Sequence, residues 1–272
     1  MKTDLIYGVE DRPPFKDALF AALQHLLAIF VAIITPPLII ASALKLDVEK
    51  TSFLVSMSLF ASGVSTFIQC RRIGPIGAKL LCIQGTSFSF IGPIIATGLV
   101  GGLPLIFGSC IAAAPIEMVV SRTFKYLRNI ITPLVSGIVV LLIGLSLIKV
   151  GIVSCGGGYS AMDDGSFGSW ENLSIAALVL LSVLFFNRCK NKYLRMSSIV
   201  FGLCLGYGLA FALGKVNMSA LNVEMLMSFN IPQPFKYGID FNISSFIAIG
   251  LVYLITAIEA TGDVTANSMI SG

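Results

Sequence analysis

Long apolar runs separated by short polar connections dominate this sequence and limit what it can fold into. Runs of roughly bilayer-spanning length occupy residues 17–43, 52–70, 80–99, 103–121, 130–149, 172–187, 195–213 and 244–268. The 272 residues are 56% hydrophobic and 12% charged, whereas soluble domains are about a quarter charged. We therefore expect an all-α polytopic membrane protein with about eight transmembrane helices.

The basic residues predict how these helices are oriented. With the amino terminus inside, most Lys and Arg residues fall in inner segments: Lys2, Arg12, Lys16, Arg71, Arg72, Lys79, Arg122, Lys125, Arg128, Arg188, Lys190, Lys192 and Arg195. The outer segments hold Lys45, Lys50, Lys149, Lys215 and Lys236. This positive-inside pattern predicts a multi-pass protein of the cell (inner) membrane with a cytoplasmic amino terminus. The net charge of +4 is then a topology signal, and no nucleic-acid partner is expected.

Two classes of catalytic site are disfavoured by the residue inventory. The six cysteines are dispersed without a CxxC pair, and a single histidine without HExxH provides no zinc site. Thr261-Gly262-Asp263 is similar to the aspartate motif of intramembrane proteases, but the other aspartates fall in loops or at helix ends. A second carboxylate on a facing helix, which that chemistry needs, is missing. We expect no enzyme, no metal and no cofactor.

The third apolar run contains an unusual polar patch. Beside Gly85 and ahead of Pro93 it carries four polar residues, Gln84, Thr86, Ser87 and Ser89. Hydroxyl groups in membrane helices often bond their own backbone, which is the structural alternative. Irregular backbone at membrane depth is tolerated where it lines a cavity. We favour a broken third helix, preceded by a short extended segment, that faces a substrate.

Ionisable residues inside the predicted spans are few: His25, Glu117, Glu259 and Asp263. Glu259 and Asp263 are four residues apart, so a helix places both carboxylates on one face, about 6 Å apart. A carboxylate at membrane depth normally faces a cavity or a partner. Glu117 is expected to form an interfacial ion pair with Arg122, whereas His25 is equally compatible with a structural and a site-supporting role.

Two further segments receive structural interpretations. Residues 150–171, with three consecutive glycines and Trp170, are expected to form an exterior connection with an interfacial tryptophan. The Gly202-to-Gly206 spacing is a GxxxG pattern, which predicts close helix packing.

Several separate motifs together resemble the nucleobase–ascorbate transporter family of xanthine and uracil permeases. They are Gln24-His25, Gln84-Gly85-Thr86-Ser87-Phe88, Ile131-Thr132-Pro133-Leu134-Val135-Ser136-Gly137 and Glu259-Ala260-Thr261-Gly262-Asp263. The match runs from about residue 5 to the end in order and spacing. Glu10-Asp11-Arg12-Pro13-Pro14 and the aspartate at 263 resemble the bacterial xanthine permeases within that family.

The resemblance implies a 14-helix fold of two inverted seven-helix repeats, with a core domain that carries substrate past a gate domain in an elevator-like movement. It implies a cytoplasmic segment at 1–16, core helices at 17–127, gate helices at 128–215, an exterior loop at 216–243 and the eighth helix at 244–272. Glu259 and Asp263, together with Ser89 and Phe90, would bind a purine. His25, Gln84 and Thr86 would support the site and its proton coupling.

The implied function is proton-coupled uptake of xanthine or uric acid by a protein surrounded by lipid and homodimeric in its full-length form. Family members are much longer, so the chain is expected to be the amino-terminal part of the fold. The alternative is a non-transporting remnant or an assembly partner of a full-length homologue. An anion transporter of the same fold is disfavoured because two carboxylates repel an anion. Xanthine and urate remain open as substrates.

Overall fold

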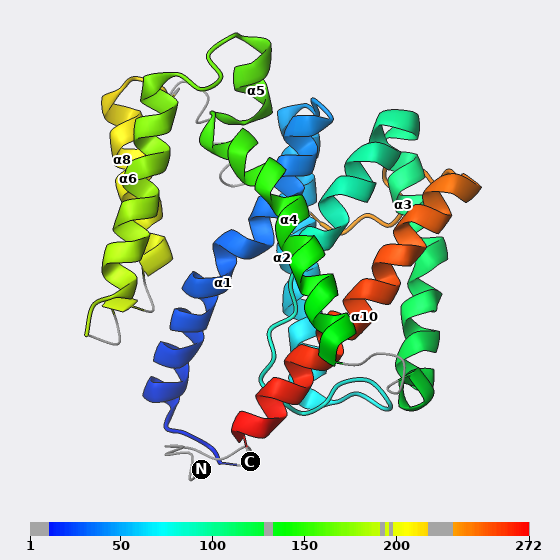
Figure 1. Ribbon diagram of the computed structural model, residues 1–272. Helices are drawn as coiled ribbons and strands as arrows, with labels where there is room; N and C mark the ends of the chain where they lie inside the picture. The colour runs from blue at the N-terminus through cyan, green and yellow to red at the C-terminus, as the bar shows by residue number, and fades with distance from the viewer. Residues whose placement is uncertain (1–10, 128–132, 191–193, 196–197, 217–230, 272) are drawn as a thin grey trace. The chain divides into compact units, whose positions relative to one another are not determined.

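The computed structural model describes residues 11–127, 133–190, 194–195, 198–216 and 231–271. Their regular structure is helical (Figure 1): α1 (Phe15–Ala43), α2 (Val48–Arg71), the 3-10 helix η1 (Phe88–Phe90), α3 (Ile91–Leu127), α4 (Pro133–Cys155), α5 (Gly158–Asp163), α6 (Trp170–Asn187), α8 (Ser198–Ala212) and α10 (Ile243–Ser271). Within these ranges the only β-type pairing is an isolated bridge between Ile73 and Ile76.

Several helices have the length and composition of membrane spans. Among the described residues, four segments are long and apolar enough: Val48–Arg71, Phe88–Thr123, Trp170–Asn187 and Ile243–Val264. Ile29–Ala43 and Ser198–Ala212 are shorter apolar helices. The prediction of an all-α polytopic membrane protein is confirmed.

The third and fourth apolar runs form two helical stretches that meet at a kink within α3, and the first stretch begins later than its hydropathy predicts. Residues 80–87 are not helical, and the helix that follows η1 continues from Ile91 to Leu127. It is interrupted only at Gly101 and Gly102, whose backbone angles are not helical. Gly102 has a φ of +66°, a conformation that glycine adopts without a Cβ penalty. The kink therefore lies between the predicted runs 80–99 and 103–121.

The chain divides into two compact units, which are described separately. Unit 1 comprises the described residues of 1–12, 33–147 and 232–272, and unit 2 those of 13–32 and 148–231. In unit 1, α10 packs along α3 (Figure 1). Apolar side chains of both helices are buried there, among them Ile91, Leu105, Ala113, Ile249 and Val252. This contact holds the start of α3 beside α10.

In unit 2, α6 packs against α8 through glycine. A Cβ at Gly202 would lie 2.6 Å from a methyl carbon of Val183, and one at Gly206 would lie 2.5 Å from a methyl carbon of Val179. Neither distance is compatible with a real side chain, so the two helices approach closely only because these positions are glycine. The packing predicted from the GxxxG spacing is confirmed.

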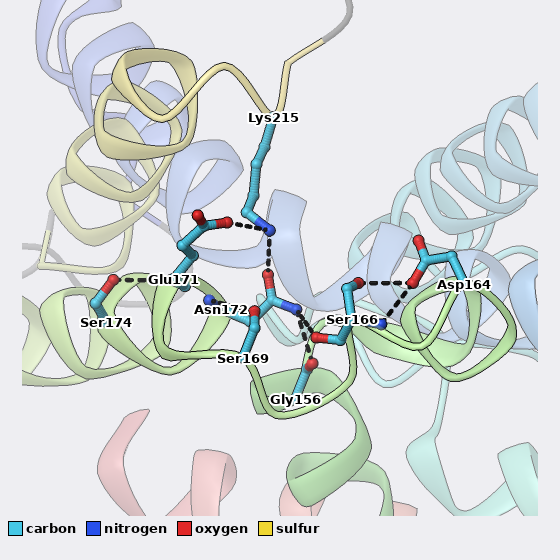
Figure 2. A network of polar contacts seen from close by, with 8 residues as sticks. All are labelled: Gly156, Asp164, Ser166, Ser169, Glu171, Asn172, Ser174 and Lys215. Carbon is cyan, nitrogen blue, oxygen red and sulfur yellow. Dashed lines mark hydrogen bonds and ion pairs between the residues drawn. The ribbon is translucent and has the colours of Figure 1, made fainter.

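The connection before α6 is more ordered than its glycine-rich sequence predicts. Helix α4 extends to Cys155, and the short helix α5 lies within the segment interpreted as an exterior loop. Asn172 is buried, and its side-chain amide donates to the carbonyls of Gly156 (2.9 Å) and Ser166 (3.0 Å). Its carbonyl accepts from Lys215, which also pairs with Glu171 at 3.0 Å (Figure 2).

The polar network around Asn172 extends to Asp164. The carboxylate of Asp164 accepts from the hydroxyl of Ser166 at 2.6 Å and from its backbone N–H at 2.9 Å (Figure 2). These hydrogen bonds hold the pKa of Asp164 below its usual value. The network joins the end of α4, the connection to α6 and Lys215, three residues beyond the end of α8.

The expected ion pair between Glu117 and Arg122 is not present in the described structure. Both residues lie on α3; Glu117 is half-buried and Arg122 is exposed. No ion pair of either residue occurs among the described contacts. Residues five apart on a helix point about 140° away from each other, whereas partners three or four apart share a face. The prediction was wrong because it counted sequence distance and ignored helix phase.

Candidate functional site

Hydrogen bonds to neighbouring helices hold the non-helical backbone of residues 80–87. The Gln84 backbone N–H donates to the hydroxyl of Thr66 at 2.9 Å, and its carbonyl accepts from the hydroxyl of Ser62. The hydroxyl of Thr86 donates to the carbonyl of Ile33 at 2.9 Å. Irregular backbone at membrane depth needs such partners. This non-helical segment is therefore held between α1 and α2.

The helical turn that follows this segment begins with a serine cap. The side chain of Ser87 accepts a hydrogen bond from the backbone N–H of Ser89 at 3.3 Å. The hydroxyl of Ser89 itself is buried and has no hydrogen-bond partner among the described residues. It lies within interaction range of the carboxyl group of Glu259 on α10. A buried hydroxyl without a partner costs free energy, which a bound ligand can recover.

The two acidic residues of α10 lie on one stretch of continuous helix. Glu259 and Asp263 are exposed, and their charges interact with each other. The hydroxyl of Thr261, between them in sequence, donates to the carbonyl of Ala257 at 2.7 Å. The Thr261 hydroxyl thus bonds the backbone of its own helix. The two carboxyl groups, in contrast, are not covered by other described parts of the protein.

Aromatic side chains lie beside this region. The rings of Phe90 and Tyr253 meet edge to face, with centroids 5.0 Å apart and planes at 70°. The hydroxyl of Tyr253 donates to the carbonyl of Cys110 at 3.4 Å. Both rings line a cavity of about 740 Å³ in unit 1, which is also lined by Thr86 and Ser87. The cavity is within the size range of sites that bind small molecules.

The structure brings together some of the residues named from the sequence. Ser89 lies beside Glu259, and Asp263 follows Glu259 by four residues on α10. Phe90 and Thr86 line the adjacent cavity. The side-chain amide of Gln84 donates to the carbonyl of Cys82 at 3.2 Å, so Gln84 supports the non-helical segment of residues 80–87. His25 is exposed on α1 within unit 2, a part of the chain that is described separately from Glu259.

Sequence reasoning missed Tyr253 as a residue beside the site. It lies on α10 and contacts Phe90, which is far from it in the chain. Nothing in the local pattern distinguishes this tyrosine from an ordinary membrane-helix aromatic residue. Its role follows only from the packing of α10 on α3.

Comparison with known proteins decides the family. The sequence profile of the Permease family, named for xanthine and uracil permeases, matches residues 16–272. This chain belongs to the xanthine/uracil permease family. The family consists of membrane transporters and not of enzymes.

Relatives from this family are similar along nearly the whole chain. Xanthine permease XanP of Escherichia coli (strain K12) is 47% identical over 280 residues, which cover 99% of this chain and 60% of XanP. Xanthine permease XanQ of the same strain is 47% identical over 278 residues, with coverage of 99% and 59%. Uric acid permease PucJ of Bacillus subtilis (strain 168) is 34% identical over 254 residues, with coverage of 92% and 56%. The chain spans about 60% of the length of XanP and XanQ.

Proposed function

We propose that this chain takes part in proton-coupled purine uptake across the cell (inner) membrane, with xanthine or uric acid as substrate. Relatives named for these two substrates support a purine. The observation that carries the proposal is the buried hydroxyl of Ser89, which has no hydrogen-bond partner within the described geometry and lies in interaction range of the exposed Glu259 carboxyl group. Such polar groups at membrane depth are expected where a substrate binds.

The chemistry of a purine fits this pair. Xanthine and urate present ring N–H donors and carbonyl acceptors along the edge of a flat ring. A carboxylate accepts from N–H groups, and a serine hydroxyl donates to a carbonyl or a ring nitrogen. The rings of Phe90 and Tyr253 provide apolar contact for the flat faces. Glu259 would therefore bind the purine directly, supported by Ser89 and Phe90.

Proton coupling follows from the second carboxylate. Asp263 follows Glu259 by about one helical turn on α10, so the two carboxyl groups of this membrane helix are neighbours. A site that holds a proton in one state and releases it in another can couple substrate movement to a proton gradient. We propose that Glu259 and Asp263 together exchange this proton. The proposal further includes the elevator-like movement, a supporting role of His25 in proton coupling, and a homodimer of the full-length protein.

The test is uptake of radiolabelled xanthine in cells that lack their own purine permeases. Two proteins are compared: the 272-residue chain alone, and a fusion in which the part of XanP beyond the matched region follows it. In the fusion, Glu259→Gln is expected to abolish accumulation, because the amide cannot exchange a proton. The matched control is Glu117→Gln, which also removes a carboxylate from a span of unit 1.

Several results decide the proposal. It requires uptake by the fusion that is lost in Glu259→Gln and retained in Glu117→Gln, with both variants present in the membrane at equal amounts. Accumulation at the unaltered level in Glu259→Gln would remove this residue from the mechanism. Competition of labelled xanthine by unlabelled urate then determines whether the small Ser89 side chain admits the extra oxygen of urate.

A further inference from the structure

The connection that leaves α2 folds into a tight turn, which we define as residues 71–79. The backbone N–H of Ile73 donates to the carbonyl of Ile76 at 2.9 Å, and the reverse bond measures 3.2 Å. The backbone N–H of Lys79 donates to the carbonyl of Gln69 at 3.1 Å, which closes the turn against the end of the helix. In Figure 1 the turn lies at the lower end of α2.

Gly77 shows how closely the turn packs on α2. Its φ is +95°, and a Cβ there would lie 2.4 Å from the carbonyl oxygen of Ile68. No other residue type fits this position without moving the backbone. The turn therefore has a defined shape at the membrane end of α2, so the side chains it carries are held near one another.

Three cations belong to this turn and have no acidic partner in the part of the chain that the structure describes. Arg71, Arg72 and Lys79 are exposed. Among the described residues, the ion pairs involve Lys50, Lys215 and Lys236, and none involves the cations of the turn. The guanidinium of Arg71 lies 5.6 Å from the ring centre of Phe67, a contact that leaves its charge uncompensated.

Two aliphatic side chains accompany the cations. Ile73 is 53% exposed and Ile76 is 64% exposed, on either side of the Gly74-Pro75 tip. Exposing two isoleucine side chains to water costs free energy, because apolar surface is poorly hydrated. Together with the cations they match a membrane surface, where apolar side chains reach the acyl chains and cations reach the headgroups.

We propose that the 71–79 turn binds the anionic headgroup of a membrane phospholipid. Arg71, Arg72 and Lys79 contact the phosphate, while Ile73 and Ile76 enter the boundary between headgroups and acyl chains. The turn directly follows a helix that is long and apolar enough to cross the bilayer, so its cations lie at headgroup level. This position and the isoleucine pair favour a lipid over a free phosphate ion. The site is independent of the purine site.

The test is equilibrium binding of short-chain phosphatidylglycerol to the purified chain in detergent, compared with phosphatidylcholine of the same acyl length. Each cation near an anionic surface contributes about fivefold in affinity, so Arg72→Gln/Lys79→Gln should lower phosphatidylglycerol affinity about tenfold or more. Ile73→Ser/Ile76→Ser should weaken both lipids and leave their ratio unchanged. Arg188→Gln/Lys190→Gln, which removes two cations from the connection after α6, is the matched control and should change neither.

Three results would overturn the lipid site. They are equal affinity for the two lipids, full competition by inorganic phosphate at the concentration of the lipid, and an equal loss in the Arg188→Gln/Lys190→Gln control. Helix content by circular dichroism verifies folding of each variant. If the double substitution unfolds the chain, the single Lys79→Gln variant decides, with about fivefold weaker phosphatidylglycerol binding expected.

Discussion

The α6–α8 pair of unit 2 and the α3–α10 pair of unit 1 place their buried polar groups in opposite situations. In the first turn of α6, the amide and carbonyl of Asn172 have partners on three segments of the chain. In the α3–α10 region, the hydroxyls of Ser89 and Ser109 are buried without a hydrogen-bond partner among the described residues. The hydrogen bonds of Asn172 stabilise the fold of unit 2, whereas the hydroxyls of Ser89 and Ser109 in unit 1 remain able to form hydrogen bonds.

The hydroxyls of Ser89 and Ser109, both buried without a partner among the described residues, differ in what lies next to them. Ser89 lies beside Glu259, so its open hydroxyl belongs to a place where a polar ligand would be held. Ser109 is fully buried within α3, and nothing indicates a ligand there. A buried polar group without a partner therefore indicates a binding site only when a second functional group lies within reach.

The largest effect is expected at Asn172. Asn172→Ala removes three side-chain hydrogen bonds, each worth about 1 kcal/mol, and should lower the free energy of unfolding by about 3 kcal/mol. Thermal unfolding of the chain in detergent measures this. The control is Asn187→Ala at the exposed far end of α6, where a change within about 0.5 kcal/mol is expected. Equal effects of both substitutions would refute the structural role of the Asn172 network.

A smaller loss of unfolding free energy is expected from a substitution at the contact between α6 and α8. Gly202→Leu forces a side chain into the space of Val183 and should cost about 2 kcal/mol of unfolding free energy. Gly208→Leu on the same helix meets no atom within 4 Å and is the matched control. Unfolding of both variants under the same conditions compares them. If Gly208→Leu proves as damaging as Gly202→Leu, close packing is not the reason for glycine at position 202.

In the α3–α10 pair, a substitution is expected to stabilise. Ser109→Ala removes a fully buried hydroxyl without a partner and should raise the free energy of unfolding by about 1 kcal/mol. Ser58→Ala, which removes a hydroxyl that donates to the carbonyl of Leu54 at 2.7 Å, should show no gain. A loss of stability in Ser109→Ala would mean that its hydroxyl has a partner after all.

The smallest effect concerns the cap of α2 and depends on pH. Asp47 accepts hydrogen bonds from the backbone N–H and the ammonium of Lys50, which hold the pKa of Asp47 below the usual 3.8. A carboxyl group with a lowered pKa in the folded state stabilises that state at neutral pH. This contribution decreases as pH falls below 3.8 and is lost once pH passes the folded pKa. Unfolding from pH 6 to pH 3 should therefore show a decline that is reduced in Asp47→Asn; identical profiles would contradict the cap.

The pattern of apolar residues along the sequence predicted the helices and contacts that depend on local sequence. The run at 244–268 became α10, and the GxxxG spacing at Gly202 predicted its close contact. The start of α3 was harder, because hydropathy is blind to the non-helical backbone of residues 80–87. The polar patch around Gln84 nevertheless indicated it. The short helix α5 was missed because its glycine-rich surroundings are typical of loops.

The candidate site was predictable only in part for a physical reason. Glu259 and Asp263 are recognisable because a carboxylate inside an apolar run is costly. The approach of Ser89 to Glu259 and the contact of Phe90 with Tyr253 join distant parts of the chain, and no local periodicity encodes them. The Asn172 network is of the same kind, since it links residues on three segments. Such contacts required the structure.

Xanthine affinity of Ser89→Ala and Ser109→Ala, measured in the XanP fusion by equilibrium binding to membranes, tests the central claim most directly. Both substitutions remove one unpartnered hydroxyl from unit 1, but only Ser89 lies beside Glu259. A hydrogen bond to ligand is worth about 1 kcal/mol, so Ser89→Ala should weaken binding about fivefold while Ser109→Ala leaves it unchanged. Equal xanthine affinity of the two variants would contradict a purine site between the start of α3 and α10.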